Sequence, residues 1–203
     1  MDRLDEVLSA CVPLLDRVDD LLETAGAPEG HEVWRELRRV RLLPGDAARA
    51  VAGLRPAAFD DAVDELRAEA RTCAEAAIDL PAAGDWTGDA ADAYETARRR
   101  VADRLSGDDE SLDERLEATA DLAQALTDWM TKSRSDLAGT LAEMLSSGEA
   151  LTLAAGLGSP PTVAETGAAA TVAAQVLRTI ADNYADADEL LQGSIDLGTP
   201  VPM

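Results

Sequence analysis

Carboxylates are the groups in this sequence best able to do chemistry. The chain has 40 Asp and Glu, 18 Lys and Arg, one histidine, His31, and two cysteines, Cys11 and Cys73. Paired carboxylates can move protons or bind cations. The segment 182–189, DNYADADE, brings four acids together. It lacks the central glycine of a calcium loop and has a helical pattern, so we predict no metal site there.

The other reactive groups form no recognisable catalytic motif. The sequence has no HExxH, no phosphate-binding loop, no GxGxxG and no nucleophile elbow. Cys11 and Cys73 lie 62 positions apart without CxxC spacing, each on an apolar helical stripe. We expect both to pack as small core residues, with a disulfide between them as the less favoured alternative. The sequence therefore predicts a protein that is not an enzyme, with no cofactor.

Charge limits the partners of the chain. The formal net charge is -22 and is spread along the whole sequence. Nucleic acids and anionic membranes are repelled by such a surface, whereas cationic or apolar protein surfaces are attracted or tolerated. The first 20 residues carry acids where a Sec signal needs basic residues, and the apolar segment near 150–158 is too short to span a bilayer. We expect no Sec signal and no membrane span.

Hydrophobic periodicity indicates helices nearly everywhere and no convincing strand. The sequence predicts an all-α fold, an elongated bundle of antiparallel helices. Pro13 interrupts the first apolar stripe and is expected to kink that helix or to mark a new start. We expect one structural domain whose parts are an N-terminal helical layer over 1–55, a helical bundle over 57–192 and a flexible tail over 193–203.

An aromatic residue marks a break between two of the expected helices. Trp86 and Gly88 lie in PAAGDWTGD, between helices expected over 57–80 and from about residue 89. Glycine allows backbone conformations that other residues avoid, so a tight turn fits here. We expect the two helices to form a hairpin, with the Trp86 ring covering its tip.

The segment WTGDAADAY, residues 86–94, resembles the WXG family of type VII (ESX) secretion proteins. The matching residues are Trp86, Gly88, Ala90, Ala91 and Tyr94. The resemblance covers about residues 57–192, and it implies a helical hairpin with the Trp-x-Gly triplet in its turn. It also implies export from the cytoplasm without a Sec signal.

A second segment, YADAD, resembles the Y-x-x-x-D/E export motif of the same family. Tyr184 and Asp188 are four positions apart, so they share one face of a helix. The resemblance implies that the type VII apparatus, its ATPase or a chaperone reads this pair. Another helical WXG-like protein is a further partner that it implies.

The spacing of the two motifs departs from that of short family members. Trp86 and Tyr184 are 98 residues apart, which leaves room for an additional helix. We expect the chain to contain both halves of a composite bundle and to be a monomer, with a homodimer as the second choice. The alternative function is a cytosolic acidic binding partner, antitoxin-like or immunity-like, or a helical scaffold.

Overall fold

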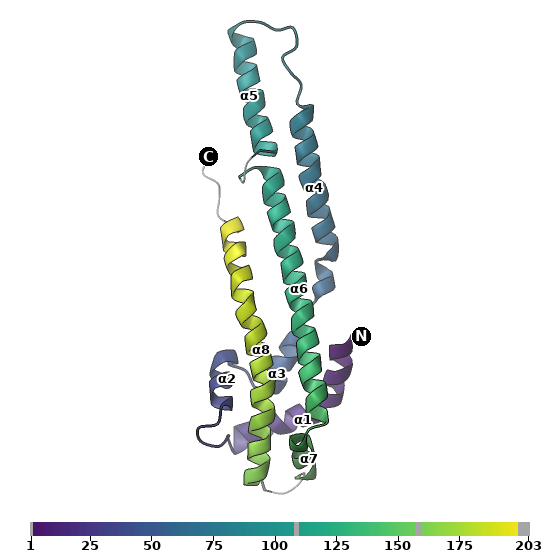
Figure 1. The fold of residues 1–203 in the computed structure, drawn as a ribbon, viewed down its shortest axis with the longest axis vertical. Helices are drawn as coiled ribbons and strands as arrows, with labels where there is room; N and C mark the ends of the chain where they lie inside the picture. The colour runs from purple at the N-terminus through teal and green to yellow at the C-terminus, as the bar shows by residue number, and fades with distance from the viewer. Residues whose placement is uncertain (1, 108–109, 157–159, 199–203) are drawn as a thin grey trace. The chain divides into compact units, whose positions relative to one another are not determined.

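The computed structural model describes residues 2–107, 110–156 and 160–198, apart from the side chains of 188, 189 and 196–198. Every regular element in these ranges is a helix, which confirms the prediction of an all-α protein (Figure 1). The elements are α1 (Arg3–Thr24), α2 (Val33–Val40), α3 (Pro44–Ala52), the 3-10 turn η1 (Pro56–Ala58), α4 (Asp60–Asp79), α5 (Asp89–Leu105), α6 (Leu112–Leu145), α7 (Gly148–Ala155) and α8 (Val163–Gly198).

The chain divides into two compact units. Unit 1 contains residues 1–55 and 129–188, and unit 2 contains residues 56–128 and 189–203. The boundary at residue 55 coincides with the end of the expected N-terminal layer. Residues 129–188, however, group with that layer and not with the rest of 57–192. Periodicity could not reveal this grouping, because it is created by contacts between distant segments.

Helix α1 runs through Pro13 without a break. The missing backbone donor of a proline costs stability inside a helix. Here the apolar side chains of α1 are buried on both sides of Pro13. They are Leu4, Leu8, Cys11, Leu15 and Val18. Burial of each such side chain is worth about 1.5–3 kcal/mol, so the face outweighs the lost hydrogen bond. The new helix start that we considered at residue 13 is therefore wrong.

The main hydrophobic core belongs to unit 1. Helix α1 packs against α3 and α7. The core is completed by α6 and α8, whose buried side chains include Leu137, Leu141, Met144, Val176 and Leu177. The Cys11 thiol lies within this core, 3.6 Å from the Leu141 carbonyl oxygen, and burial raises its pKa to about 11. Both cysteines are free thiols, so the two are not joined.

A carboxylate of α1 caps the first turn of α3. Both carboxylate oxygens of Asp19 accept from the Gly45 backbone N–H, at 3.1 and 3.2 Å. A Cβ atom at position 45 would clash with an Asp19 carboxylate oxygen, so this contact as it stands favours glycine. Burial raises the Asp19 pKa to about 6. The bond from Gly45 and the attraction of Arg49 both act to lower this pKa, but burial outweighs them.

This raised pKa predicts a pH-dependent stability. A folded-state pKa above the ordinary 3.8 means that the folded chain takes up a proton more readily than the unfolded chain. The Asp19 contribution to the free energy of unfolding should therefore rise as the pH falls from about 7 to about 4, whereas acids with a lowered pKa, such as Glu36, contribute in the opposite direction. For this half-buried group we expect an Asp19 contribution of roughly 1 kcal/mol after solvent screening. Denaturant unfolding at several pH values measures it.

Asp19→Asn is the matched control, because it keeps an acceptor for Gly45 and removes the titration. The difference between the two pH profiles isolates Asp19 from the other acids, whose neutralisation also relieves charge repulsion. Identical pH profiles for the two proteins would contradict the prediction.

A buried arginine of α6 joins three segments of unit 1. The side chain of Arg134 is 8% exposed and forms ion pairs with Asp2 and Asp5 at the start of α1, at 2.7 and 3.0 Å. Its Nη1 atom donates to backbone carbonyls at the end of α3, those of Val51, Ala52 and Leu54. The guanidinium therefore neutralises a cluster of acids and caps a helix end at once.

Unit 2 has a thinner core. Helices α4 and α5 pack against each other, on either side of the loop 80–88 (Figure 1). The buried apolar side chains of α4 and α5 are Val63, Ala70, Ala77 and Ala91, mostly small. Small side chains let helix backbones approach closely but bury little area. An ion pair from Arg67 to Asp121, at 3.1 Å, ties α4 to the first half of α6.

Helix α8 begins at a capping box and continues beyond the expected end. The Glu165 carboxylate accepts from the Thr162 N–H at 2.8 Å, and the Thr162 hydroxyl accepts from the Glu165 N–H at 3.2 Å. Helix α8 extends to Gly198, so most of the tail expected over 193–203 is helical. Residues 199–203 lie outside the described part of the chain.

Candidate functional site

The Trp-x-Gly segment forms a loop with two left-handed glycines. Gly84 has φ 62°, and Gly88, the residue before α5, has φ 90° and ψ -175°. These conformations strain residues with a side chain, which explains glycine at both positions. The rings of Trp86 and Tyr94 meet edge to face, with centroids 5.8 Å apart and planes at 61°.

Two side chains of α5 hold the first part of this loop. The Tyr94 hydroxyl donates to the Pro81 carbonyl at 2.6 Å, and the Glu95 carboxylate accepts from the Ala83 N–H at 2.7 Å. The bond from Ala83 and then the bond from Arg98 hold the Glu95 pKa below its ordinary value. Tyr94 was expected only as part of the motif, and its role as an anchor of the loop required the structure. Glu95 carried no signal in the sequence.

The Trp86 ring is much more exposed than expected. It is 65% exposed, so it does not cover the tip of α4 and α5 as a packed cap. Of the two motif alanines, Ala91 is buried and Ala90 is exposed. The loop is short and its glycines set its path, so the indole contacts Tyr94 and is otherwise open to solvent. An exposed indole is suited to contact with another molecule.

Trp86→Ala should therefore have only a small effect on stability. An aromatic pair of this kind contributes about 0.5–1.5 kcal/mol, and the exposed ring leaves no cavity when it is removed. We expect a loss of about 1 kcal/mol or less with unchanged helicity, measured by denaturant unfolding followed by circular dichroism. Tyr94→Phe, which keeps the ring and removes the bond to Pro81, is the control. A loss above about 2 kcal/mol would mean that the ring is buried.

The second motif residue, Tyr184, lies on α8 in unit 1. Its ring is 43% exposed and meets the Trp129 ring of α6 edge to face, at a centroid distance of 5.2 Å and an angle of 90°. The Trp129 indole N–H donates to the Asn183 carbonyl at 2.7 Å. Position 188 is in α8, but the Asp188 side chain lies outside the described part of the structure. Trp86 belongs to unit 2 and Tyr184 to unit 1.

Polar contacts fix the same turn of α8 from the α6 side. Asn183 is buried and accepts from the Lys132 ammonium at 2.7 Å, while its amide nitrogen donates to the Thr179 carbonyl at 3.1 Å. Lys132 also pairs with Asp136 and Asp186, at 3.1 and 3.6 Å. Trp129 and Lys132 are three residues apart on α6, so they contact α8 from one face.

Helix α2 holds the same turn of α8 through an ion-pair network. Arg39 bonds to Asp182 and to Glu36, both at 2.8 Å. Glu36 is fully buried. Burial acts to raise its pKa, but bonds from Arg35 and Arg39 outweigh burial and lower it. Glu36 is therefore ionised at neutral pH and holds the Arg39 guanidinium, which bonds to Asp182 on the turn of α8 that carries Tyr184.

A groove lies beside Tyr184. Its volume is about 440 Å³. It is lined by Arg39, Val40, Leu42, Ala47, Ala50, Ile180, Ala181, Tyr184 and Ala185, and we call it the Tyr184 groove. The lining is mostly aliphatic, with the Tyr184 ring and the Arg39 guanidinium as its polar groups. Apolar grooves of this size with few polar groups are typical of binding sites.

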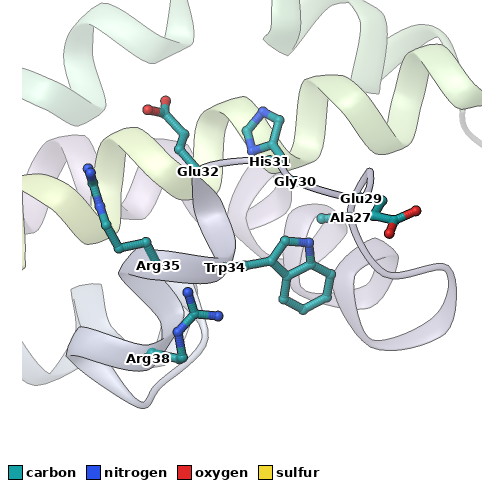
Figure 2. A pocket seen from close by; sticks show the side chains of 8 residues that line it. All are labelled: Ala27, Glu29, Gly30, His31, Glu32, Trp34, Arg35 and Arg38. Atoms are coloured by element: carbon teal, nitrogen blue, oxygen red, sulfur yellow. The ribbon is translucent and has the colours of Figure 1, made fainter.

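A second pocket, of about 590 Å³, lies along the segment 27–38 (Figure 2). Figure 2 shows the Trp34 ring pointing toward the loop that carries Ala27 and Glu29. The Trp34 indole N–H donates to the Pro28 carbonyl at 3.1 Å, and the ring is 38% exposed rather than buried in the core. His31 accepts from the Val33 N–H at the start of α2, so it has a structural role.

Several residues of the Tyr184 site were not identified from the sequence. None of the sequence motifs includes Trp129, Lys132, Asn183 or Arg39. The i, i+3 spacing of Trp129 and Lys132 was visible, but their partner lies more than 50 positions away. Among the described residues no group of three or more His, Cys, Asp or Glu is arranged to hold a metal ion.

Comparisons with protein-family models, with curated proteins and with solved structures gave no match. In the described ranges, no helix combines the length and the apolar character that crossing a bilayer demands.

Proposed function

We propose that this chain is a non-enzymatic helical protein that a type VII secretion system exports and that acts through protein–protein contacts. The observation that supports this most is the position of Tyr184. Its ring is half-exposed, while Trp129, Asn183 and Lys132 hold the turn of α8 that carries it. An ordered, accessible ring one helical turn before a carboxylate position is what a receptor needs to read the pair.

The exposed Trp86 ring is a second contact point in this proposal. It lies in a glycine-shaped loop on unit 2, where Tyr94 and Glu95 fix the loop. Loops that are fixed by such bonds but present an apolar ring are suited to protein recognition. The partners we propose are the secretion apparatus with its ATPase or chaperone, and another helical WXG-like protein.

Secretion is the direct test of the proposed function. The protein should appear in the culture medium of a producing strain that has a working type VII apparatus, and should stay in the cells when the apparatus is disabled. A cytosolic enzyme followed in the same fractions controls for lysis. Retention in cells that have the active apparatus would reject export.

The alternative is a cytosolic acidic partner that masks a basic protein surface, or a scaffold. The net charge of -22 favours it, because such a surface attracts cationic partners at long range. It leaves the exposed Trp86 ring without a role. Fractionation separates the two proposals, since this alternative requires the protein to remain inside the cell.

We further propose that the chain folds without a partner and is a monomer, with a homodimer as the alternative. Unit 1 has a continuous core drawn from α1, α3, α6, α7 and α8. The net charge opposes association through polar faces. Sedimentation at several concentrations should give a constant mass near 21 kDa. A mass that rises with concentration, or a chain that orders only when a partner is added, would contradict this expectation.

A further inference from the structure

We propose that an exposed surface of α2 binds an acidic segment of a partner protein. The surface consists of Trp34, Arg38, Arg41 and Leu42, and we call it the α2 face. All four residues belong to unit 1. This binding goes beyond the proposed export and does not depend on it.

Arginines are concentrated at α2 in a chain that is otherwise acidic. Positions 35–41 hold four of the 18 Lys and Arg, in a chain with 40 Asp and Glu. The buried Glu36 carboxylate engages two of the four, Arg35 and Arg39. Within the described part of the chain, the side chains of the other two, Arg38 and Arg41, have no ion pair and no hydrogen bond. Each of these guanidinium groups is free to hold a carboxylate of another molecule by two parallel bonds.

The backbone conformation of Arg41 is a second, independent observation. Arg41 follows the last residue of α2 and is left-handed, with φ 62° and ψ 24°. In the described ranges, every other residue with positive φ is a glycine. Glycine adopts this conformation at less cost, so it would suit the end of α2 better than arginine. Residues with a side chain in such conformations cluster at functional sites, which assigns the Arg41 guanidinium to binding.

Exposed apolar side chains flank the two free arginines. Trp34 lies one helical turn before Arg38, and its ring is 38% exposed. Leu42 follows Arg41 directly and is 44% exposed. Tryptophan and arginine are the residues that most often carry the binding energy of a protein interface. The partner segment should therefore have apolar side chains next to its acids.

The acids beside the α2 face do not neutralise it. Glu32 pairs with Arg178 of α8, and Glu36 is neutralised within α2. Glu29 lines the same pocket as Trp34 and Arg38, but Figure 2 shows its carboxylate turned away from the Trp34 ring. The two guanidinium groups therefore remain the local charges that a partner meets.

A short acidic protein segment fits this surface better than a polyanion does. The net charge of -22 repels any anion at a distance, but salt at physiological strength screens this field beyond about 8 Å, so direct contacts decide. Nucleic acids and anionic membranes bind through many charges at once. Two free guanidinium groups cannot offset the repulsion that so many charges meet from the rest of the chain.

A designed peptide tests the α2 face. The probe is a Leu/Glu peptide of roughly 12 residues, long enough to pass both ends of α2. The comparison is the same peptide with glutamine at every glutamate. We expect the Leu/Glu peptide to bind about tenfold or more tightly in calorimetry, because hydrogen bonds between charged groups are the stronger ones. In spectra of the ¹⁵N-labelled protein, the shifts should concentrate at the Trp34 indole N–H, Arg38, Arg41 and Leu42.

Charge-removing variants locate the binding. Arg38→Gln combined with Arg41→Gln should weaken the Leu/Glu peptide about tenfold or more. Arg71→Gln combined with Arg99→Gln is the matched control, because it removes two charges from exposed arginines of α4 and α5. The control should keep the affinity within about twofold, since salt screens distant charges.

Arg41→Gly separates binding from stability. Glycine takes the left-handed conformation freely, so the urea midpoint of unfolding should stay the same or rise, while the affinity for the Leu/Glu peptide falls about threefold or more. A lower midpoint would assign Arg41 to the fold and not to binding.

Three results would overturn the inference. They are equal affinity for the glutamate and glutamine peptides, unchanged affinity in the variant that lacks both Arg38 and Arg41, and binding of duplex DNA or of phosphatidylserine vesicles as tight as that of the Leu/Glu peptide. The last result would mean that the α2 face attracts anions in general.

Discussion

Replacing Arg134 with methionine is expected to lower the free energy of unfolding by about 2–3 kcal/mol. Arg134 is nearly buried and donates to two carboxylates and three carbonyls from separate segments of unit 1. Methionine fills a similar volume but makes none of these bonds, although the Val51 carbonyl keeps the bond from the Leu54 N–H and the Ala52 and Leu54 carbonyls keep bonds from Arg55. Hydrogen bonds to a charged group contribute about 1.5–3 kcal/mol each when buried, and less at partly exposed partners such as Asp2 and Asp5. Urea unfolding at neutral pH measures the loss.

Two further variants make this result interpretable. Arg134→Lys keeps the charge, but an ammonium cannot match the planar fork that bonds α1 and α3 together, so we expect an intermediate loss. Arg71→Met changes an exposed arginine of α4 and should shift stability by about 0.5 kcal/mol or less. A loss below about 1 kcal/mol in Arg134→Met would show that the network does not support the fold.

Tyr184→Ala or Asp188→Ala is expected to abolish export while the protein stays folded. A receptor that reads a ring and a carboxylate one turn apart loses half of its contact in either variant. For Tyr184→Ala we expect about 1 kcal/mol of lost stability, because the edge-to-face contact with Trp129 disappears from a half-exposed site. The measurement is the secreted fraction, together with helicity and melting of the purified protein.

The spacing can be tested at constant composition. Combining Ala187→Asp with Asp188→Ala moves the carboxylate by one position and rotates it about 100° around α8. We expect this variant to fail in export as well. Asp64→Ala removes an exposed acid from α4, where it takes no part in the contacts around Tyr184, and is the matched control. Normal secretion of the protein that lacks both Tyr184 and Asp188 would reject recognition by this pair.

The helices were predictable because local patterns decide them. The period of apolar residues placed α4 and the start of α5 close to their observed bounds. The Thr162–Glu165 capping box joins residues only three positions apart, so a local sequence pattern contains both partners. The loop around Trp86 was predictable for the same reason, since Gly84 and Gly88 supply the conformations that a tight loop needs.

The exposure of single side chains and the grouping of distant segments were decided by the tertiary structure. The sequence placed Trp86 at the loop, but the path of the chain between Gly84 and Gly88 left the ring open to solvent. Pro13 suggested a break, and burial on both sides of it kept α1 whole. The grouping of 129–188 with 1–55 followed from the shared core, which no local pattern encodes.

Amino-acid sequence alone determined that the chain is helical and strongly acidic, and that Tyr184 and Asp188 share a face of one helix. Only the tertiary structure placed Trp129 against Tyr184, Arg134 between α1 and α3, and a groove beside α8. Helix formation depends on residues three or four positions apart, whereas these contacts join residues 50 or more positions apart. Their partners are chosen by how the helices pack, and one sequence read locally does not contain that choice.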